Sequence, residues 1–205
     1  MAMITADPKD VPRVDEFAFT PANLEKAQAL IAQYPAGRQA SAVIGLLDLA
    51  QRQAGGWLPR AAMDHVAGIL GMAPIRVYEV ASFYTMFNLK PVGRFLVQVC
   101  TTTPCWLRGS DEVLRACKEV ARCDVGETSK DGMFTVIEVE CLGACVNAPM
   151  MQINDDFYED LDAGSTFRIL GSLARGEKVT VGSQTGRRSS EPAGAAVTLT
   201  ARRKG

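Results

Sequence analysis

The sequence predicts an α+β protein in which an N-terminal helical bundle is followed by a separate α/β domain. In the first half, apolar residues recur at helical spacing, whereas in the second half β-rich runs alternate with single helical patterns. Pro91 and Gly93 lie between the two patterns. We therefore expect a helical domain over residues 17–90, an α/β domain over 91–182 and an extended basic C-terminal tail over 183–205.

The composition is that of an ordinary globular chain. At 205 residues and 47 % hydrophobic content, it can bury the core of one or two domains. The best apolar run, residues 42–50, contains Asp48 and is far shorter than the roughly 18 to 20 residues that span a bilayer. We therefore expect no direct membrane span. The N-terminus lacks an apolar signal-peptide core and mixes acidic with basic residues, so we expect a cytosolic compartment.

The charge pattern argues for a protein partner and against a nucleic acid. The net charge is −1, and residues 183–205 hold five basic residues and one acidic residue. No aromatic side chain is interleaved with those cations, so the tail lacks the pattern of a nucleic-acid footprint. The stretch 91–182 is acidic, with 14 carboxylates against 9 cations.

Four helices are expected in the first domain. Thr20 is a suitable N-cap with Pro21 at the first helical position, and this helix stops at Pro35. In this helix and the next two, apolar residues recur at helical spacing and define one buried face, and glycines end the second and third runs. The face residues are Leu24, Ala27, Ile31 and Tyr34, then Val43, Leu46, Leu47 and Ala50 before Gly55, then Ala62, Val66, Ile69 and Leu70 before Gly71.

The fourth helix begins at Pro74 and carries apolar residues on more than one side. Its aromatic run has Tyr84 on one side of the predicted helix and Tyr78, Phe83 and Phe87 on the other. Such a run is either core or an interface, and the sequence favours neither.

The second domain is predicted to follow the order β-α-β-β-α. Residues 95–99 form a strand, Ser110 caps a helix, and residues 134–139 form the next strand. A hairpin around residues 150–159 is then followed by a last helix that Ser165 caps. This order resembles a compact thioredoxin-like layer.

Four of the six cysteines form two short pairs, each directly after a predicted strand: Cys100 with Cys105, and Cys141 with Cys145. Because the cytosol keeps thiols reduced, these cysteines favour metal binding or redox chemistry over a disulfide framework. Thiolates are soft ligands, and four of them select zinc or an iron-sulfur cluster over hard cations.

The spacing of the pairs narrows the choice of metal centre. C-x4-C and C-x3-C loops are longer than the C-x2-C knuckles common in structural zinc sites, and they suit a wider two-iron centre. The spacing differs from the four-iron and plant-type motifs, and a Rieske centre would need two histidines where the chain has only His65. Structural zinc and a dithiol redox pair remain alternatives, although the C-x-x-C of a thioredoxin-type enzyme is absent.

Three other residues are set aside. Cys117 lies on the apolar face of its predicted helix, and Cys123 follows the end of that helix, so both are interpreted as buried fillers. His65 has no second ligand near it in sequence and is interpreted as a surface or packed histidine.

The cysteine loops also resemble a known family. Cys100–Gly109 (CTTTPCWLRG) and Glu140–Met150 (ECLGACVNAPM) are similar to the cluster loops of the 24 kDa (E) family of small subunits of respiratory complex I, the NADH-quinone oxidoreductase. The resemblance includes Tyr78–Gly93 (YEVASFYTMFNLKPVG) and Thr185–Gly194 (TGRRSSEPAG), and covers about residues 17–200.

This resemblance implies a thioredoxin-like [2Fe-2S] ferredoxin domain in an electron-transfer subunit of NADH-quinone oxidoreductase. One [2Fe-2S] cluster would be held by Cys100, Cys105, Cys141 and Cys145, and no catalytic residue is expected on this chain. NADH and FMN would bind the partner flavoprotein subunit, and the large iron-sulfur subunit of complex I would be a second partner. The small subunit of an NAD-linked formate dehydrogenase or hydrogenase is the related alternative.

The same resemblance implies a place in the cell and a role for the tail. The subunit would lie in a peripheral arm on the cytoplasmic side of the bacterial inner membrane, or on the matrix side in mitochondria. The hydroxyls of Thr101, Thr102 and Thr103 are candidate donors to the cluster sulfurs, and Trp106 and Pro149 are candidate shields against water. We expect the tail to contact the flavoprotein partner, and its removal to spare cluster assembly.

Overall fold

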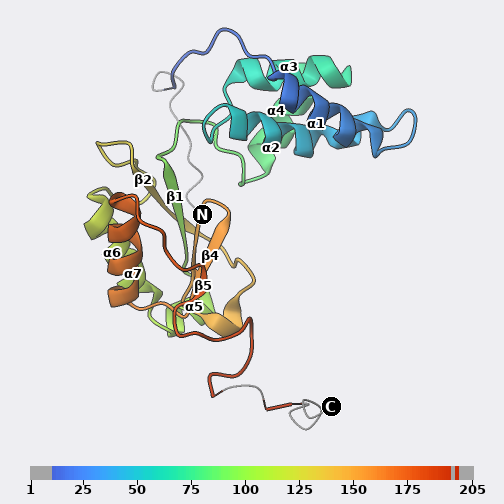
Figure 1. Cartoon of the computed structure of the whole chain (residues 1–205). Helices are drawn as coiled ribbons and strands as arrows, with labels where there is room; N and C mark the ends of the chain where they lie inside the picture. Colours follow the sequence, from blue (N-terminus) through green and yellow to red (C-terminus); the bar gives the residue numbers. More distant parts are fainter. Residues whose placement is uncertain (1–10, 195–196, 199–205) are drawn as a thin grey trace. The chain divides into compact units, whose positions relative to one another are not determined.

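The computed structural model describes residues 11–194 and 197–198, and the chain divides after Val92 into two compact units. The first unit contains four α-helices and a short 3-10 helix (Figure 1). They are α1 (Pro21–Ala32), η1 (Gln39–Ala42), α2 (Val43–Gln53), α3 (Arg60–Leu70) and α4 (Pro74–Phe83).

The start of α1 and the end of α3 follow the predicted signals, whereas α1 ends at Ala32, before the predicted stop at Pro35. The Thr20 side chain accepts a hydrogen bond from the Asn23 backbone N–H, and Pro21 opens α1. Gly71 ends α3 in the left-handed region, at φ 63°.

The core of this unit differs from the predicted one at two elements. Leu46 and Leu47 are wholly buried as expected, but α1 contributes only Ala27 to the fully buried set, and Leu24 and Tyr34 are exposed. Helix α4 ends at Phe83, so Tyr84 and Phe87, which were predicted within it, lie beyond its end. Phe87 is buried in the core, whereas the Phe83 side chain is 75 % exposed.

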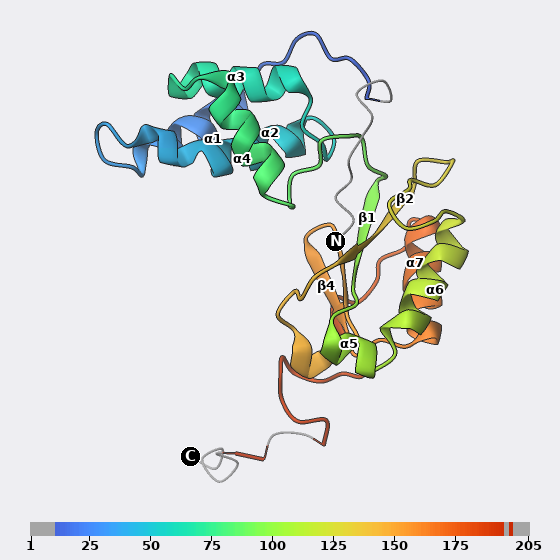
Figure 2. The same cartoon turned by 180° about the vertical axis from the view of Figure 1, so that it is seen from behind.

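The second unit is a five-stranded sheet with α-helices (Figure 2). Strand β1 pairs in parallel with β2 and antiparallel with β3, β4 pairs antiparallel with β3, and β5 pairs in parallel with β4, in the order β2-β1-β3-β4-β5. Helices α6 and α7 lie side by side against the sheet in both views. The elements are β1 (Phe95–Cys100), α5 (Thr103–Leu107), α6 (Ser110–Ala121), β2 (Phe134–Val139), η2 (Cys145–Asn147), β3 (Met151–Ile153), β4 (Asp156–Glu159), α7 (Ala163–Ala174) and β5 (Gly182–Ser183).

Close packing of the first two strands depends on one glycine. A Cβ atom on Gly93 would lie 2.7 Å from the carbonyl carbon of Phe134, a distance that real Cβ atoms essentially never show. Without that Cβ, the Gly93 N–H reaches the Thr135 hydroxyl at 2.6 Å. Glycine therefore permits the entry into β1 to lie against the start of β2.

Two helix caps differ from the prediction. Gly109, at φ 94°, is the N-cap of α6, and Ser110 is its first helical residue. The tight connection from α5 needs a left-handed residue before α6, a conformation that glycine adopts without strain. Asp162, not Ser165, caps α7, and the two residues form a capping box in which each side chain accepts a hydrogen bond from the other's backbone N–H.

The region after α7 is also more ordered than the predicted tail. The expected boundary at residue 183 falls inside β5, since Tyr158 pairs with Gly182 and Glu159 with Ser183. The backbone N–H of Gln184 continues this contact by donating to the Glu159 carbonyl at 2.9 Å. The early part of the tail is thus joined to the sheet unit.

Candidate metal centre

The strand register brings the two cysteine pairs to the same end of the sheet. Cys100 is the last residue of β1 and is paired with Val139, the last residue of β2. Because β1 and β2 are parallel, the chain that leaves β2 toward Cys141 emerges beside Cys100. The antiparallel strand β3 begins at this end, and the Cys100 N–H donates to the Met150 carbonyl at 3.3 Å. The end of the second cysteine loop, at Met150, is thereby held next to β1.

The first pair lies on regular structure and is buried. Cys100 ends β1 and Cys105 lies in α5, with side chains 2 % and 1 % exposed. Ala148 and Met150 from the second loop form one buried cluster with these two cysteines. Helix α5 was expected as an irregular loop, so the sequence patterns missed the element that places Cys105.

The second pair lies on an exposed loop. The sulfur atoms of Cys141 and Cys145 are 3.3 Å apart, and both cysteines are exposed free thiols. Gly143, at φ 87°, reverses the chain between them, and its N–H donates to the Cys141 sulfur at 3.4 Å. A single turn therefore brings these two sulfurs together.

The thiols of the two pairs differ in how readily they ionise. Burial alone would raise the pKa of Cys100, but hydrogen bonds from Thr102, Cys105 and the Leu142 backbone bring it below its usual value. Burial and the adjacent Cys100 thiol raise the pKa of Cys105 to about 12. The hydrogen-bonded Cys141 thiol raises the pKa of Cys145.

The pairs also influence each other through their charge. A thiolate at Cys145 raises the pKa of Cys105, and one at Cys100 raises the pKa of Cys145. Ionising several of these thiols together would therefore require a positive partner, which a metal centre provides. Among the described residues, no three His, Cys, Asp or Glu side chains are grouped as ligands of a single metal ion.

The surroundings supply some of the expected donors and shields. The Thr102 hydroxyl lies 3.3 Å from the Cys100 sulfur, whereas the Thr101 backbone N–H is directed to the Val139 carbonyl. Pro149 is buried beside the loop. Trp106 is 57 % exposed at the surface of α5, and its shielding of a cluster stays a prediction.

The remaining cysteines belong to the core of the sheet and not to the cluster around the first pair, but only Cys117 is the buried filler that was predicted, since Cys123 is half-buried. Cys117 is wholly buried under the sheet, 4.0 Å from the Met151 sulfur, and burial raises the pKa of its thiol to about 12. Cys123 donates to the Glu127 carbonyl at 3.6 Å.

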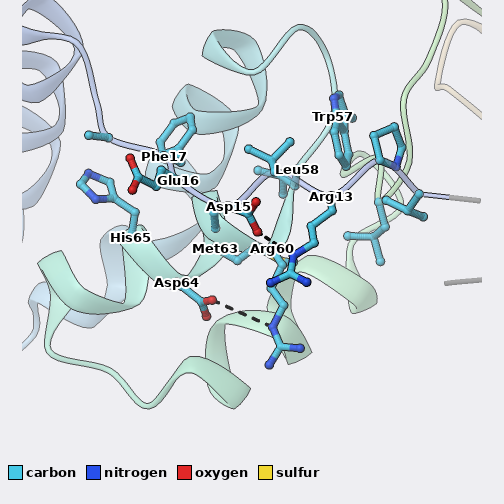
Figure 3. A pocket seen from close by; sticks show the side chains of 16 residues that line it. Arg13, Asp15, Glu16, Phe17, Trp57, Leu58, Arg60, Met63, Asp64 and His65 are labelled. Atoms are coloured by element: carbon cyan, nitrogen blue, oxygen red, sulfur yellow. Dashed lines mark hydrogen bonds and ion pairs between the residues drawn. The ribbon is translucent and has the colours of Figure 1, made fainter. Parts of the chain in front are cut away.

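The helical unit has a pocket whose described lining residues include no cysteine (Figure 3). The extended segment 11–18 borders it together with Trp57 and His65. His65 packs edge-on against the rings of Phe17 and Phe19, and its Nε2 accepts a hydrogen bond from the Phe19 N–H. Burial lowers its pKa. His65 is therefore a packed histidine, as expected.

Several polar residues that hold the second cysteine loop were not singled out from the sequence. Asn147 follows Cys145 by two residues and is buried, and Asp160 and Arg187 form a largely buried ion pair beside it. The one available signal was that Arg187 belongs to the Thr185–Gly194 stretch that carried part of the family resemblance.

Comparisons with known proteins show the family of the chain. The sequence profile of the thioredoxin-like [2Fe-2S] ferredoxin family matches residues 27–174. The chain is 56 % identical to a mitochondrial NADH dehydrogenase [ubiquinone] flavoprotein 2 from Dictyostelium discoideum, over 85 % of this chain and 71 % of that protein. It is 58 % identical to the E-type subunit of NADH-quinone oxidoreductase from Rickettsia bellii, over 78 % of this chain and 96 % of that protein.

Among solved structures, a chain of an NAD+-reducing [NiFe]-hydrogenase matches with a TM-score of 0.57 at 21 % identity. The match covers 64 % of this chain and 22 % of the hydrogenase chain, and at this identity it bears on the fold alone. Within the described residues, no helix is both long and apolar enough to cross a membrane.

Proposed function

Since the chain belongs to the thioredoxin-like [2Fe-2S] ferredoxin family, and within it to the E-type subunits of NADH-quinone oxidoreductase, we propose that its two cysteine pairs hold one [2Fe-2S] cluster. The observation that carries this proposal is the convergence of both pairs at one end of the sheet, with thiols that interact electrostatically. Two sulfurs from each loop suit a centre with two irons. The proposed ligands are Cys100, Cys105, Cys141 and Cys145.

The bound cluster would accept one electron and pass it on. The chain's own residues hold it with four thiolates and direct N–H and hydroxyl groups toward the sulfurs, as Gly143 and Thr102 do. The acidic sequence of residues 91–182 opposes the addition of an electron, and these hydrogen bonds favour it. The chain supplies no catalytic residue, and NADH and FMN bind the partner.

The proposed partners are the flavoprotein subunit, whose FMN exchanges electrons with the cluster, and the large iron-sulfur subunit of complex I. Exposed apolar side chains next to the cysteine loops support docking there, namely Trp106, Leu107 and Val146. The assembly would be a peripheral arm on the cytoplasmic side of the bacterial membrane, or on the matrix side in mitochondria.

We also propose that the chain is organised into a helical bundle over 17–90, a thioredoxin-like domain over 91–182 and a C-terminal segment over 183–205. Separate apolar cores in the two units support the first division. The first part of the third stretch extends the sheet, so it works with the thioredoxin-like domain.

Visible absorption and electron paramagnetic resonance of the anaerobically purified chain test the cluster assignment. We expect a coloured protein whose reduced form has the resonance of one [2Fe-2S] cluster. A colourless, zinc-containing sample would support a zinc-stabilised adaptor, and dithiol turnover that survives iron removal would support a thiol-disulfide oxidoreductase. Co-purification with quinone-linked membrane subunits distinguishes complex I from the formate dehydrogenase and hydrogenase alternatives.

A further inference from the structure

Residues 182–191, here called the clamp segment, pack against the loop that carries the second cysteine pair. The segment begins in β5 at the edge of the sheet and then crosses the same end of the unit as α5, as both views show (Figures 1 and 2). Its contacts join parts of the chain that are far apart in sequence, since Arg187 reaches residues 27 and 41 positions earlier.

Arg187 is the central residue of the clamp segment. Its guanidinium pairs with the Asp160 carboxylate through two groups, with Nε donating to Oδ2 at 3.2 Å and Nη2 donating to Oδ1. The two side chains are only 12 % and 5 % exposed. The Ser183 hydroxyl also donates to Asp160 Oδ2, at 2.6 Å. The carboxylate therefore fixes the orientation of the guanidinium plane.

The remaining Arg187 nitrogen reaches the cysteine loop. Nη1 donates to the Val146 carbonyl at 3.3 Å and to the Glu191 carbonyl at 3.2 Å. Val146 directly follows Cys145, so this bond holds the backbone next to a proposed cluster ligand. The bond to Glu191 closes the clamp segment around the same guanidinium.

Asn147 makes a second connection between the same parts. Its side chain N–H₂ group donates to the Ser189 carbonyl and to the Glu159 carboxylate, each at 2.8 Å. Its own backbone carbonyl accepts from the Asp160 N–H at 2.7 Å. Two successive residues after Cys145 are thereby tied to β4 and to the clamp segment.

Burying an ion pair is not by itself a source of stability, because removing two charges from water offsets much of their attraction. The Arg187–Asp160 pair has a geometric effect instead, since it directs a charged donor at one carbonyl of a three-residue 3-10 turn. An exposed turn of this length has few contacts of its own to fix its shape.

We propose that Arg187, oriented by Asp160, is a positioning residue that holds the turn after Cys145 in the shape that retains the cluster. The proposal rests on the proposed function. It reverses the expectation that removal of residues 183–205 spares cluster assembly, because residues 183–191 hold a ligand loop. Partners around a metal site typically change metal retention about 10- to 100-fold when replaced.

The test compares Arg187→Gln, Arg187→Lys and Arg188→Gln in the full chain with its cluster. Arg188→Gln is the matched control, because Arg188 is exposed and enters the clamp segment through its backbone N–H. The measurement is the rate at which the visible absorption of the cluster disappears in an iron chelator. We expect about tenfold faster loss for Arg187→Gln, a smaller increase for Arg187→Lys, and the wild-type rate for the control.

A core variant separates positioning from general destabilisation. Ile169→Val truncates a side chain of α7 that is buried in the core of the sheet unit, and it leaves the hydrogen-bonding groups of Arg187, Asp160 and Asn147 in place. The proposal is overturned if Ile169→Val and Arg187→Gln have equal unfolding midpoints and lose their clusters at the same rate. It is also overturned if the cluster of Arg187→Gln is lost at the same rate as that of Arg188→Gln. Should Arg187→Gln fail to fold, the comparison of Arg187→Lys with Arg188→Gln decides in the same way.

The outcome for the proposed function is read separately. A wild-type chain that carries no [2Fe-2S] cluster contradicts the proposed function itself. A wild-type chain that carries the cluster, together with an Arg187→Gln variant that keeps it equally long, contradicts only the role of Arg187.

Discussion

The two cysteine pairs meet at one end of the same sheet, but they are positioned by different means. Cys100 and Cys105 lie at the end of a strand and in a helix, and both are buried. Cys141 and Cys145 lie on an exposed turn, which Gly143 and the clamp segment of residues 182–191 shape.

This difference shows how one site can combine a buried cysteine pair held by regular structure with an exposed pair that a partner can reach. The first pair is placed by the hydrogen bonds of β1 and by burial, which also keeps water away from it. The second pair faces the surface, where a partner can approach the centre. Its loop therefore depends on side-chain contacts made by residues remote in sequence.

The largest effect should come from removing a proposed ligand from either pair. Replacing Cys100 or Cys141 by Ser should abolish or badly destabilise the cluster, because a hydroxyl is a much poorer ligand for iron than a thiolate. Cys117→Ser should leave the visible spectrum intact, since its thiol is buried away from both pairs. The reverse pattern in the visible spectra would overturn the ligand assignment.

The next effect should distinguish the pairs in the apoprotein. Iodoacetamide should modify Cys141 and Cys145 at least about tenfold faster than Cys100 and Cys105, because a buried thiol reacts only when the structure opens. The lowered pKa of Cys100 and the raised pKa of Cys145 oppose this order for those two thiols, whereas the pKa of Cys105, raised to about 12, favours it. Mass spectrometry of the digested chain gives the rates, and equal rates would show that the two halves open together.

A third test disturbs the close packing of the segment that leads into β1, the strand that ends at Cys100, against β2. Gly93→Ala should lower the free energy of unfolding by about 1–3 kcal/mol, because its Cβ would collide with the Phe134 backbone. Gly171→Ala, inside α7, is the matched control, since its Cβ would meet only the flexible end of Arg175 at 3.5 Å. That control should be neutral or stabilising by up to about 1 kcal/mol. Denaturant unfolding measures both, and a neutral Gly93→Ala would contradict the close strand packing.

The smallest effect concerns a thiol that must stay protonated. The pKa of Cys117 is raised by burial to about 12, above the value of an unfolded thiol, about 8.5. The folded state therefore keeps a proton that the unfolded state releases, so this contribution is full below about pH 8.5 and is lost as pH rises toward about 12.

Between about pH 8 and 9.5, the free energy of unfolding of the wild type should therefore fall. That of Cys117→Ala should fall by about 1 kcal/mol less. Denaturant midpoints at these two pH values, taken on both proteins, give the difference. Parallel losses in the two proteins would mean that Cys117 ionises without opening the core.

The comparison of the pairs also explains how far the sequence could be interpreted. The strand 134–139 was predicted with its observed bounds, and β1 to within one residue, because β-rich runs lead directly into Cys100 and Cys141. Parallel neighbours then place both pairs at one end. Local patterns were enough for the strand bounds, since each is set by residues close in sequence, whereas the pairing of the two strands joins residues far apart in the chain.

The features that were missed depend on contacts between distant residues or on special backbone conformations. Helix α5 has five residues, too few for an apolar period, and Gly109 displaced Ser110 from the cap of α6. Strand β5 is two residues long, and the Arg187–Asp160 pair joins positions 27 residues apart. No sequence period signals such contacts, so the support of the second pair became visible only in three dimensions.

The most direct test of the central claim is a count of iron, acid-labile sulfide and zinc in the anaerobically purified chain. One [2Fe-2S] cluster held by both pairs predicts two irons and two sulfides per chain and no zinc. It also predicts that Cys145→Ser loses the iron and the sulfide together. One zinc per chain without sulfide would contradict the account.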